Sequence, residues 1–327
     1  MRKSKFILLI VASIVFSTYL ESCNKDGLTH IKNNISFYSR LSDYNIFQGN
    51  PSDLIPGADF HLYELSTPLF TDYAEKQRLI KIPAGLKMSA VSEGLLNFPE
   101  GTIIVKTFFY YNDKKDTMKG KEIIETRLLI KSGLDWSVAT YVWDKNQKDA
   151  LLLTTGLNTT INWIDDKGNG RVISYHVPSV NECATCHQSG NTIIPIGPKI
   201  RNLNRMVFRN NNDINQLQYF CNSGILDALD PYSYTVLPDW QNPDNSQEQR
   251  ARAYLDVNCA HCHNENGFAS DVDLHLAFEK SLDASNIRKM KSAILERFEE
   301  GTMPKLGTSI VHKEGLELIK AYINSLN

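Results

Sequence analysis

Two copies of the pattern Cys-x-x-Cys-His constrain this chain more than any other feature of its sequence. They occupy residues 183–187 and 259–263. In each copy, two thiols three positions apart can add to the two vinyl groups of one haem, and the histidine that follows can bind the iron. We therefore predict two covalently attached c-type haems. The predicted attachment residues are Cys183, Cys186, His187, Cys259, Cys262 and His263.

A zinc site and a redox-active dithiol are the other interpretations of paired cysteines. Zinc can be held by two Cys-x-x-Cys pairs, but the histidine directly after each pair would then be an accident. A redox dithiol belongs at the start of a helix in a thioredoxin-like context, which the sequence around these pairs does not show. Haem attachment accounts for both cysteines and the histidine of each copy.

The iron on His263 needs a second axial ligand, for which methionine and histidine are the usual choices. Met303 is the candidate, because it precedes a proline in a glycine-flanked loop just before the C-terminal helix. Met290, in a helical stretch, is the weaker competitor. A methionine used as core filler is the alternative for either residue.

The iron on His187 has no candidate ligand with a supporting local pattern. Met206 comes first, His176 second, and an open or water-bound position third. His261, inside the second copy, is expected to face solvent because of its spacing. The remaining histidines expected at the surface are His30, His275 and His312.

The other two cysteines are interpreted separately. Residues 1–22 combine a basic start with an uncharged apolar run, which is typical of a signal peptide and short for a membrane-spanning helix. Cys23 follows a small serine, as in bacterial lipoproteins, so we expect cleavage before Cys23 and a lipid on its sulfur. A cleaved soluble form and an uncleaved anchor are the alternatives. Cys221 has no cysteine left to pair with and is expected to be a buried small hydrophobe.

Composition places the chain among globular proteins. Hydrophobic residues make up 42% of it and aromatic residues 10%, which is enough to fill hydrophobic cores. The formal net charge is -2, and nucleic-acid-binding proteins carry a clustered basic excess instead. We therefore expect no nucleic-acid partner, and a location in the cell envelope, lipid-anchored to a membrane and facing the periplasm or the cell surface.

The order of predicted elements indicates an α+β chain with a mainly antiparallel β domain followed by a mainly α region that carries both haems. Its predicted parts are a signal peptide (1–22), a tether (23–54), a β-rich domain (55–178), a first haem region (179–243) and a second, cytochrome c-like haem domain (244–327). Strands in a sandwich or barrel are predicted at 102–111, 125–130, 137–143, 159–164 and 171–177. Helices are predicted at 247–258 and 313–326.

Several sequence blocks resemble a known family. Residues 254–263, the Met303-Pro304 pair and the C-terminal helix resemble class I cytochrome c domains. The chain as a whole resembles a family of bacterial dihaem c-type cytochromes of unassigned physiological role. That wider resemblance spans about residue 60 to the end and is carried by blocks at 67–74, 98–108, 125–129 and 195–204. It implies haem binding, electron transfer, and a periplasmic or membrane-attached location. Residues 174–180 predict a strand and a turn before the first copy, so its pocket is expected against the β domain.

Electron transfer between redox donor and acceptor proteins is the leading functional hypothesis, because an iron with histidine and methionine ligands has no free position for a substrate. The alternative is a peroxidase- or oxidase-like enzyme with an open catalytic haem on His187. A third hypothesis is a scaffold in which the β domain recognises a partner. Its tryptophans, Trp136, Trp143 and Trp163, are more typical of a core. No catalytic residue is predicted.

Overall fold

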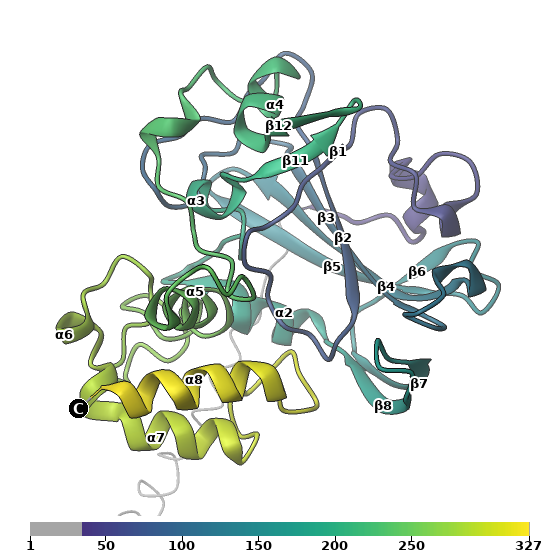
Figure 1. Ribbon diagram of the computed structural model, residues 1–327. Helices are drawn as coiled ribbons and strands as arrows, with labels where there is room; N and C mark the ends of the chain where they lie inside the picture. Colours follow the sequence, from purple (N-terminus) through teal and green to yellow (C-terminus); the bar gives the residue numbers. More distant parts are fainter. Residues whose placement is uncertain (1–34, 327) are drawn as a thin grey trace, which may run out of the picture. The chain divides into compact units, whose positions relative to one another are not determined.

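A six-stranded antiparallel sheet, whose strands follow one another in chain order from β1 to β6, forms the centre of the fold (Figure 1). The structure is a computed structural model and describes residues 35–326. The strands are β1 (His61–Leu62), β2 (Glu75–Lys81), β3 (Ile103–Tyr111), β4 (Lys121–Ser132), β5 (Asp135–Trp143) and β6 (Ala150–Leu153). Runs of β-branched and aromatic residues favour these extended segments. Together with the helices below, they make the chain α+β, as predicted.

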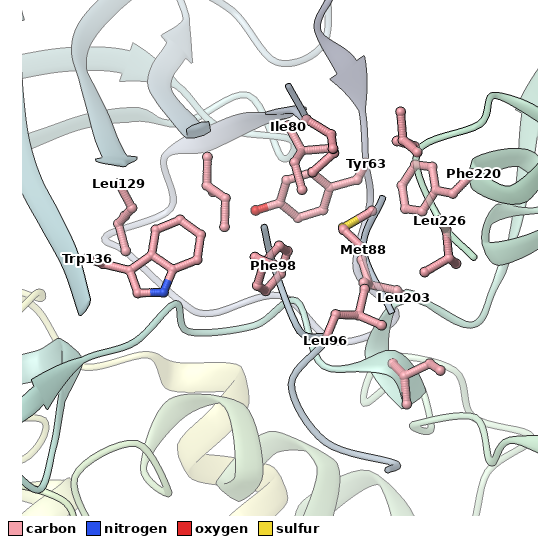
Figure 2. Packing of buried hydrophobic residues seen from close by; sticks show 14 of the residues in the cluster. Tyr63, Ile80, Met88, Leu96, Phe98, Leu129, Trp136, Leu203, Phe220 and Leu226 are labelled. Carbon is pink, nitrogen blue, oxygen red and sulfur yellow. The ribbon is translucent and has the colours of Figure 1, made fainter. Parts of the chain in front are cut away.

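Both faces of this sheet are buried. Side chains alternate between the faces of a strand, so Leu79, Val105 and Leu128 point into one cluster while Ile80 and Leu129 point into another. The first cluster is completed by residues 41–54, which belong to the segment predicted as a tether. The second is shared with residues from 183 onward, and Figure 2 shows its packing. The predicted first haem region therefore shares a core with the sheet.

Three hairpins accompany the sheet. The largest pairs β7 (Leu157–Ile164) with β8 (Gly170–Val177) and packs Trp163 and Tyr175 against Tyr110 of β3. The smaller ones pair β9 (Gln188–Ser189) with β10 (Thr192–Ile193), and β11 (Met206–Arg209) with β12 (Asn212–Asn215). Strands are present over all five predicted ranges. The main sheet is an open meander, because β1 and β6 lie at its two edges, so the predicted sandwich or barrel is not its arrangement.

The helices lie mainly in the second half of the chain. They are α2 (Val180–His187), α3 (Ile200–Leu203), α4 (Gln216–Asn222), α5 (Gln247–Asn258), α6 (Leu282–Ser285), α7 (Ile287–Glu299) and α8 (Lys313–Ser325), with short 3-10 turns η1 (Leu41–Tyr44), η2 (Pro51–Asp53), η3 (Thr117–Lys119) and η4 (Pro231–Ser233). The two predicted helices, 247–258 and 313–326, are confirmed as α5 and α8. Over residues 35–326, no helix has the length and apolar character needed to cross a membrane.

Helices α5, α7 and α8 lie close together (Figure 1) and share a further hydrophobic cluster. Gly315 of α8 lies against Tyr254 of α5, and a Cβ on the glycine would lie only 2.4 Å from the tyrosine ring. A residue larger than glycine would therefore push the two helices apart.

The segment 67–74 connects the sheet to this helical region. The Phe70 backbone N–H donates to the Asn258 side chain at the end of α5 (2.8 Å). The buried Asp72 carboxylate accepts from the Ser309 backbone N–H at 2.9 Å, and the Tyr73 hydroxyl donates to Glu314 of α8 at 2.7 Å. The block 67–74, one of those that carry the family resemblance, therefore holds the region around α5 and α8 against the sheet.

Candidate functional site

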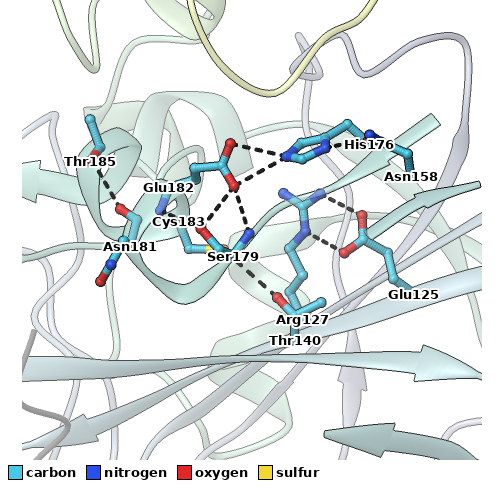
Figure 3. Close-up of polar contacts among 10 residues, drawn as sticks. All are labelled: Glu125, Arg127, Thr140, Asn158, His176, Ser179, Asn181, Glu182, Cys183 and Thr185. Atoms are coloured by element: carbon cyan, nitrogen blue, oxygen red, sulfur yellow. Dashed lines mark hydrogen bonds and ion pairs between the residues drawn. The ribbon is translucent and has the colours of Figure 1, made fainter. Parts of the chain in front are cut away.

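The first Cys-x-x-Cys-His unit lies entirely within α2, which begins three residues after the end of β8. Ser179 caps the helix: its hydroxyl accepts from the Glu182 backbone N–H, and the Glu182 carboxylate accepts from the Ser179 backbone N–H (Figure 3). The His176 ring, at the end of β8, contacts the same carboxylate at 3.0 Å. This capping box fixes where the helix starts, and so sets the position of the unit relative to the sheet.

Cys183 faces the sheet. It is 8% exposed, and its sulfur lies 3.7 Å from the Thr140 hydroxyl on β5 (Figure 3). Cys183 and Ala184 belong to the same cluster as Leu129 and Trp136 of the sheet. Burial raises the pKa of Cys183 to about 11, which keeps the sulfur a protonated thiol. The first unit therefore packs against the β-rich domain.

His187 has the hydrogen bonding that metal-binding histidines use. Its ring Nδ1 lies 2.7 Å from the Ile194 carbonyl oxygen. Since a carbonyl can only accept, Nδ1 carries the proton and Nε2 keeps its lone pair. Burial lowers the pKa of His187 to about 3, so the ring is neutral. A neutral imidazole held by a backbone carbonyl is oriented to bind a metal through its free nitrogen.

The second unit follows directly on α5. Cys259 caps that helix, its backbone N–H donating to Leu255 (3.0 Å), and the His263 N–H donates back to the Cys259 carbonyl at 2.9 Å. Burial raises the pKa of Cys259 to about 12. The Nδ1 atom of His263 is buried and has no hydrogen-bond partner within residues 35–326. Burial also lowers the pKa of this histidine, which leaves a neutral imidazole.

The two units meet in space. The side chains of Cys186 and Cys262 interact, and this contact raises the pKa of Cys186 and lowers that of Cys262. The His261 ring interacts with Cys186 as well. A cavity of about 260 Å³ opens beside this contact and is lined by Cys186, His261, Asp256 and Lys199, among others. The prediction that His261 faces solvent is wrong, because its Nδ1 is buried and the residue lines this cavity.

The residues of both units suit a covalently held haem. All four cysteines are free thiols, as thioether formation requires. His187 offers a free Nε2, and His263 has a buried ring nitrogen with no partner among the described residues. Over the same residues, no group of three or more His, Cys, Asp or Glu side chains is arranged to hold a metal ion by itself. A haem needs only one such side chain from each unit, because the porphyrin supplies four ligands to its iron.

Met303 lies in the loop between α7 and α8 and is 38% exposed. Its backbone N–H donates to Arg297 at the end of α7 (3.2 Å). Two residues later, the Lys305 ammonium lies 5.4 Å from the centre of the Phe268 ring. The structure therefore brings this loop next to the segment that follows His263. The competitor Met290 packs against the hydrophobic cluster of α5, α7 and α8.

The two ligand candidates for the first iron are held elsewhere. Met206 is 57% exposed on β11 and lines a different hollow with Val236 and Pro238. Both ring nitrogens of His176 are engaged, Nδ1 by Asn158 at 2.7 Å and Nε2 by Glu182. Neither Met206 nor His176 lines the cavity beside Cys186.

Two more predictions about histidines are wrong. His312, expected at the surface, is buried, stacks on Phe70 with 3.9 Å between ring centroids, and hydrogen-bonds through Nδ1 to the Tyr254 hydroxyl (2.9 Å). Its position just before an amphipathic helix gave no sign of this environment, which residues from distant parts of the chain create. His275, also expected at the surface, lines the cavity, and its Nδ1 is buried.

The remaining predictions concern Cys221, the three tryptophans of the β domain, His30 and Cys23. Cys221, expected to be buried, is half-buried and packs at the edge of the cluster beneath α2. The tryptophans of the β domain are core residues, as expected. His30 and Cys23, with the predicted signal peptide, lie outside the described residues.

The sequence analysis missed a polar cluster beside Cys183. Glu125 of β4 is fully buried and forms a two-point ion pair with Arg127, 2.9 Å through Nε (Figure 3). It also accepts from the Tyr175 hydroxyl at 2.6 Å. Charged residues at sheet positions where apolar ones are expected were the only available signal.

Comparisons with protein-family models, with curated proteins and with solved structures find no match for this chain. The site is therefore interpreted from its own residues.

Proposed function

We propose that this protein is a dihaem c-type cytochrome that transfers electrons through two covalently bound haems. The observation that carries this proposal is the meeting of the two Cys-x-x-Cys-His units at Cys186 and Cys262, although 76 positions (262 minus 186) separate them in the chain. Electron transfer needs redox groups close to one another, and this fold brings both attachment sites together.

The residues of each unit have separate roles in this proposal. The thiols of Cys183, Cys186, Cys259 and Cys262 add across haem vinyl groups, each forming one carbon–sulfur and one carbon–hydrogen bond. His187 and His263 bind the irons through neutral rings, and the Ile194 carbonyl holds the orientation of His187. When bound, haem supplies one-electron iron redox chemistry. Cys183 is buried and the other five cysteine and histidine residues of the two units are half-buried, which limits the access of water.

A cytochrome c-like C-terminal region is part of the same proposal. One support is the helix that leads into the second unit. This helix, α5, crosses the C-terminal helix α8 at Tyr254 and Gly315. The proposal is supported further by the Met303 loop, which adjoins the segment after His263 through Lys305 and Phe268. We propose Met303 as the second axial ligand of that iron.

The cellular setting is proposed from the sequence. A lipid on Cys23 would anchor the protein to a membrane of the cell envelope, facing the periplasm or the cell surface. Its partners there would be redox donor and acceptor proteins. Metabolic labelling with a fatty acid tests the anchor: we expect label on the wild type and none on a Cys23→Ser variant.

Intact mass of protein made with haem-attachment machinery tests the main proposal. We expect the wild type and a Cys221→Ser control each to be heavier than the bare polypeptide by the mass of two haems. The double variants Cys183→Ser/Cys186→Ser and Cys259→Ser/Cys262→Ser should each carry one haem. A wild-type chain that carries no covalent haem, or that carries zinc on the cysteines, would overturn the proposal.

A second candidate function is a peroxidase- or oxidase-like enzyme with an open catalytic haem on His187. The observation that favours it is the placement of Met206 and His176, the two ligand candidates for that iron, away from the cavity beside Cys186. Electron paramagnetic resonance of the oxidised protein separates the two functions. Two low-spin haems support the carrier, whereas one high-spin haem that reacts with peroxide supports the enzyme.

A further inference from the structure

A row of three cations crosses the face of the sheet that carries the first unit. Arg78 of β2 pairs directly with Lys106 of β3, and Lys106 pairs with Arg127 of β4. The next residue in the row is Thr140 of β5, opposite Arg127, and its hydroxyl contacts the Cys183 sulfur. The row therefore leads across three strands to a haem-attachment cysteine.

The apolar residues next to this row show that the three cations lie on the face of the sheet against which α2 packs. Ile80, Ile104 and Leu129 are two residues along the same strands, so they share a face with the cations. Those three residues pack in one cluster with Cys183 and Ala184 of α2. Both Lys106 and Arg127 act electrostatically on the His187 ring, so the cations lie near the proposed iron ligand.

The described residues do not balance the charge of this row. Only Arg127 has an ion-pair partner, Glu125. Within residues 35–326, neither Arg78 nor Lys106 has a carboxylate at ion-pair distance, and the Lys106 ammonium lies over the Phe108 ring, 4.9 Å from its centre. Like charges directly opposite each other in a sheet are destabilising.

Arg78 gives a second, independent sign of a ligand. It is only 9% exposed, and its Nη2 atom is buried with no hydrogen-bond partner among the described residues. The acidic residues near it are engaged elsewhere: Glu64 pairs with Arg209 at 3.0 Å, and Glu75 with Lys114 at 2.7 Å. A buried guanidinium N–H group without an acceptor is rare in folded proteins, so an anion is expected to complete this site.

We propose that Arg78 and Lys106 bind the propionate carboxylates of the haem that is attached to Cys183 and Cys186. This inference rests on the proposed function. Covalent attachment and the His187 bond would hold that haem beside the row, and its two propionates are the anions it carries there. Guanidinium groups match carboxylates with two parallel hydrogen bonds, which fixes the orientation of the porphyrin against the sheet.

Redox titration of the haem-loaded full-length protein tests the site, because a cation beside a haem disfavours the more positive, oxidised iron. The variants are Lys106→Met and Arg78→Met, with Lys106→Arg as the conservative variant and exposed Lys145→Met as the matched control. The haem on His187 is identified by its loss from Cys183→Ser/Cys186→Ser. We expect the Lys106→Met and Arg78→Met variants to retain both haems. Each should lower the reduction potential of the haem on His187 and leave the reduction potential of the other haem unchanged.

The remaining outcomes separate this inference from the proposed function. Lys106→Arg and Lys145→Met should keep the wild-type potentials. Two attached haems with potentials that no variant shifts would overturn the propionate site and leave the cytochrome proposal standing. A wild-type chain without haem on Cys183 and Cys186 would instead overturn the proposed function.

Thermal melting gives a readout that does not depend on iron chemistry. With both haems attached, Lys106→Met should lower the melting temperature, because it removes a partner of the propionates. In the Cys183→Ser/Cys186→Ser chain, the same substitution should raise the melting temperature, because it relieves repulsion from Arg78 and Arg127. A shift of the same sign in both backgrounds would mean that Lys106 has a structural role only, and would overturn the inference.

Discussion

The side chains of Cys186 and Cys262 lie within reach of each other, so one cysteine from each Cys-x-x-Cys-His unit lies at the same point of the molecule. Cys186 is near the end of α2, which packs on the sheet, and Cys262 follows α5, which packs on α8. Two parts of the chain with separate hydrophobic clusters thus present their reactive residues to each other.

This contact predicts a specific disulfide in the haem-free chain. On treatment with glutathione disulfide, we expect Cys186 and Cys262 to become linked. Their thiols lose two protons and two electrons, and the oxidant is reduced to two glutathione thiols. Peptide mapping by mass spectrometry identifies the link, with half-buried Cys221 remaining a free thiol as the internal control. Disulfides found only within each unit would contradict the contact.

Substitution of Met303 tests the second axial ligand on the His263 iron. Met303→Ala should abolish the weak long-wavelength absorption band of methionine-bound ferric haem and lower one reduction potential, since methionine ligation raises the potential. Met118→Ala, at a residue that is 92% exposed, is the matched control. An unchanged spectrum for Met303→Ala would assign the ligand to another residue.

Gly315→Ala should destabilise the protein through the crossing of α5 and α8. The added Cβ would lie 2.4 Å from the Tyr254 ring, and overpacking of this kind costs about 1–3 kcal/mol. Gly170→Ala is the control, because nothing lies within 4 Å of its Cβ position and its φ is not positive. Urea unfolding measures both variants. Equal stability of Gly315→Ala and the wild type would show that the helices are not packed this closely.

His312 should make the protein less stable as the pH falls. Burial lowers its pKa to about 4, from an ordinary value of 6.5. The unfolded chain therefore binds this proton at a higher pH than the folded chain, and stability is lost as the pH falls from about 6.5 to about 4. The loss amounts to roughly 3 kcal/mol.

The effect of His312 is measured as a difference between variants. His312→Gln should be less stable than the wild type at pH 7. This difference in the free energy of unfolding should be smaller at pH 4.5. The half-exposed His176→Gln is the control and should show no such narrowing. A difference in the free energy of unfolding that stays constant from pH 7 to pH 4.5 would contradict the burial of a neutral His312.

The helices and strands could be predicted because their signals are local. Helix α5 begins where Ser246 and Gln249 form a capping box, three residues apart, and its predicted range matches the observed one. The β7–β8 hairpin likewise turns where Asp165 accepts hydrogen bonds from Lys167 and Asn169 within its own loop. Such interactions act over a few residues, so a pattern in the sequence indicates them directly.

The environments of single side chains could not be predicted in the same way. His312 is buried because Phe70 and Tyr254, from distant segments, close around it. Arg78, Lys106 and Arg127 form one row only because the register of three strands aligns them. Register and docking are decided by packing over the whole chain, and no local pattern carries that information.

By itself, the sequence determined which residues we propose for haem attachment, because two thiols and an imidazole within five consecutive positions are a complete set of attachment groups. It also determined the class of most elements, through hydrophobic periodicity and helix caps. Only the tertiary structure decided that the two units face each other at Cys186 and Cys262, and that a row of cations lies beside Cys183. Those relationships join residues far apart in the chain, and they exist only once the sheet and the helices have packed together.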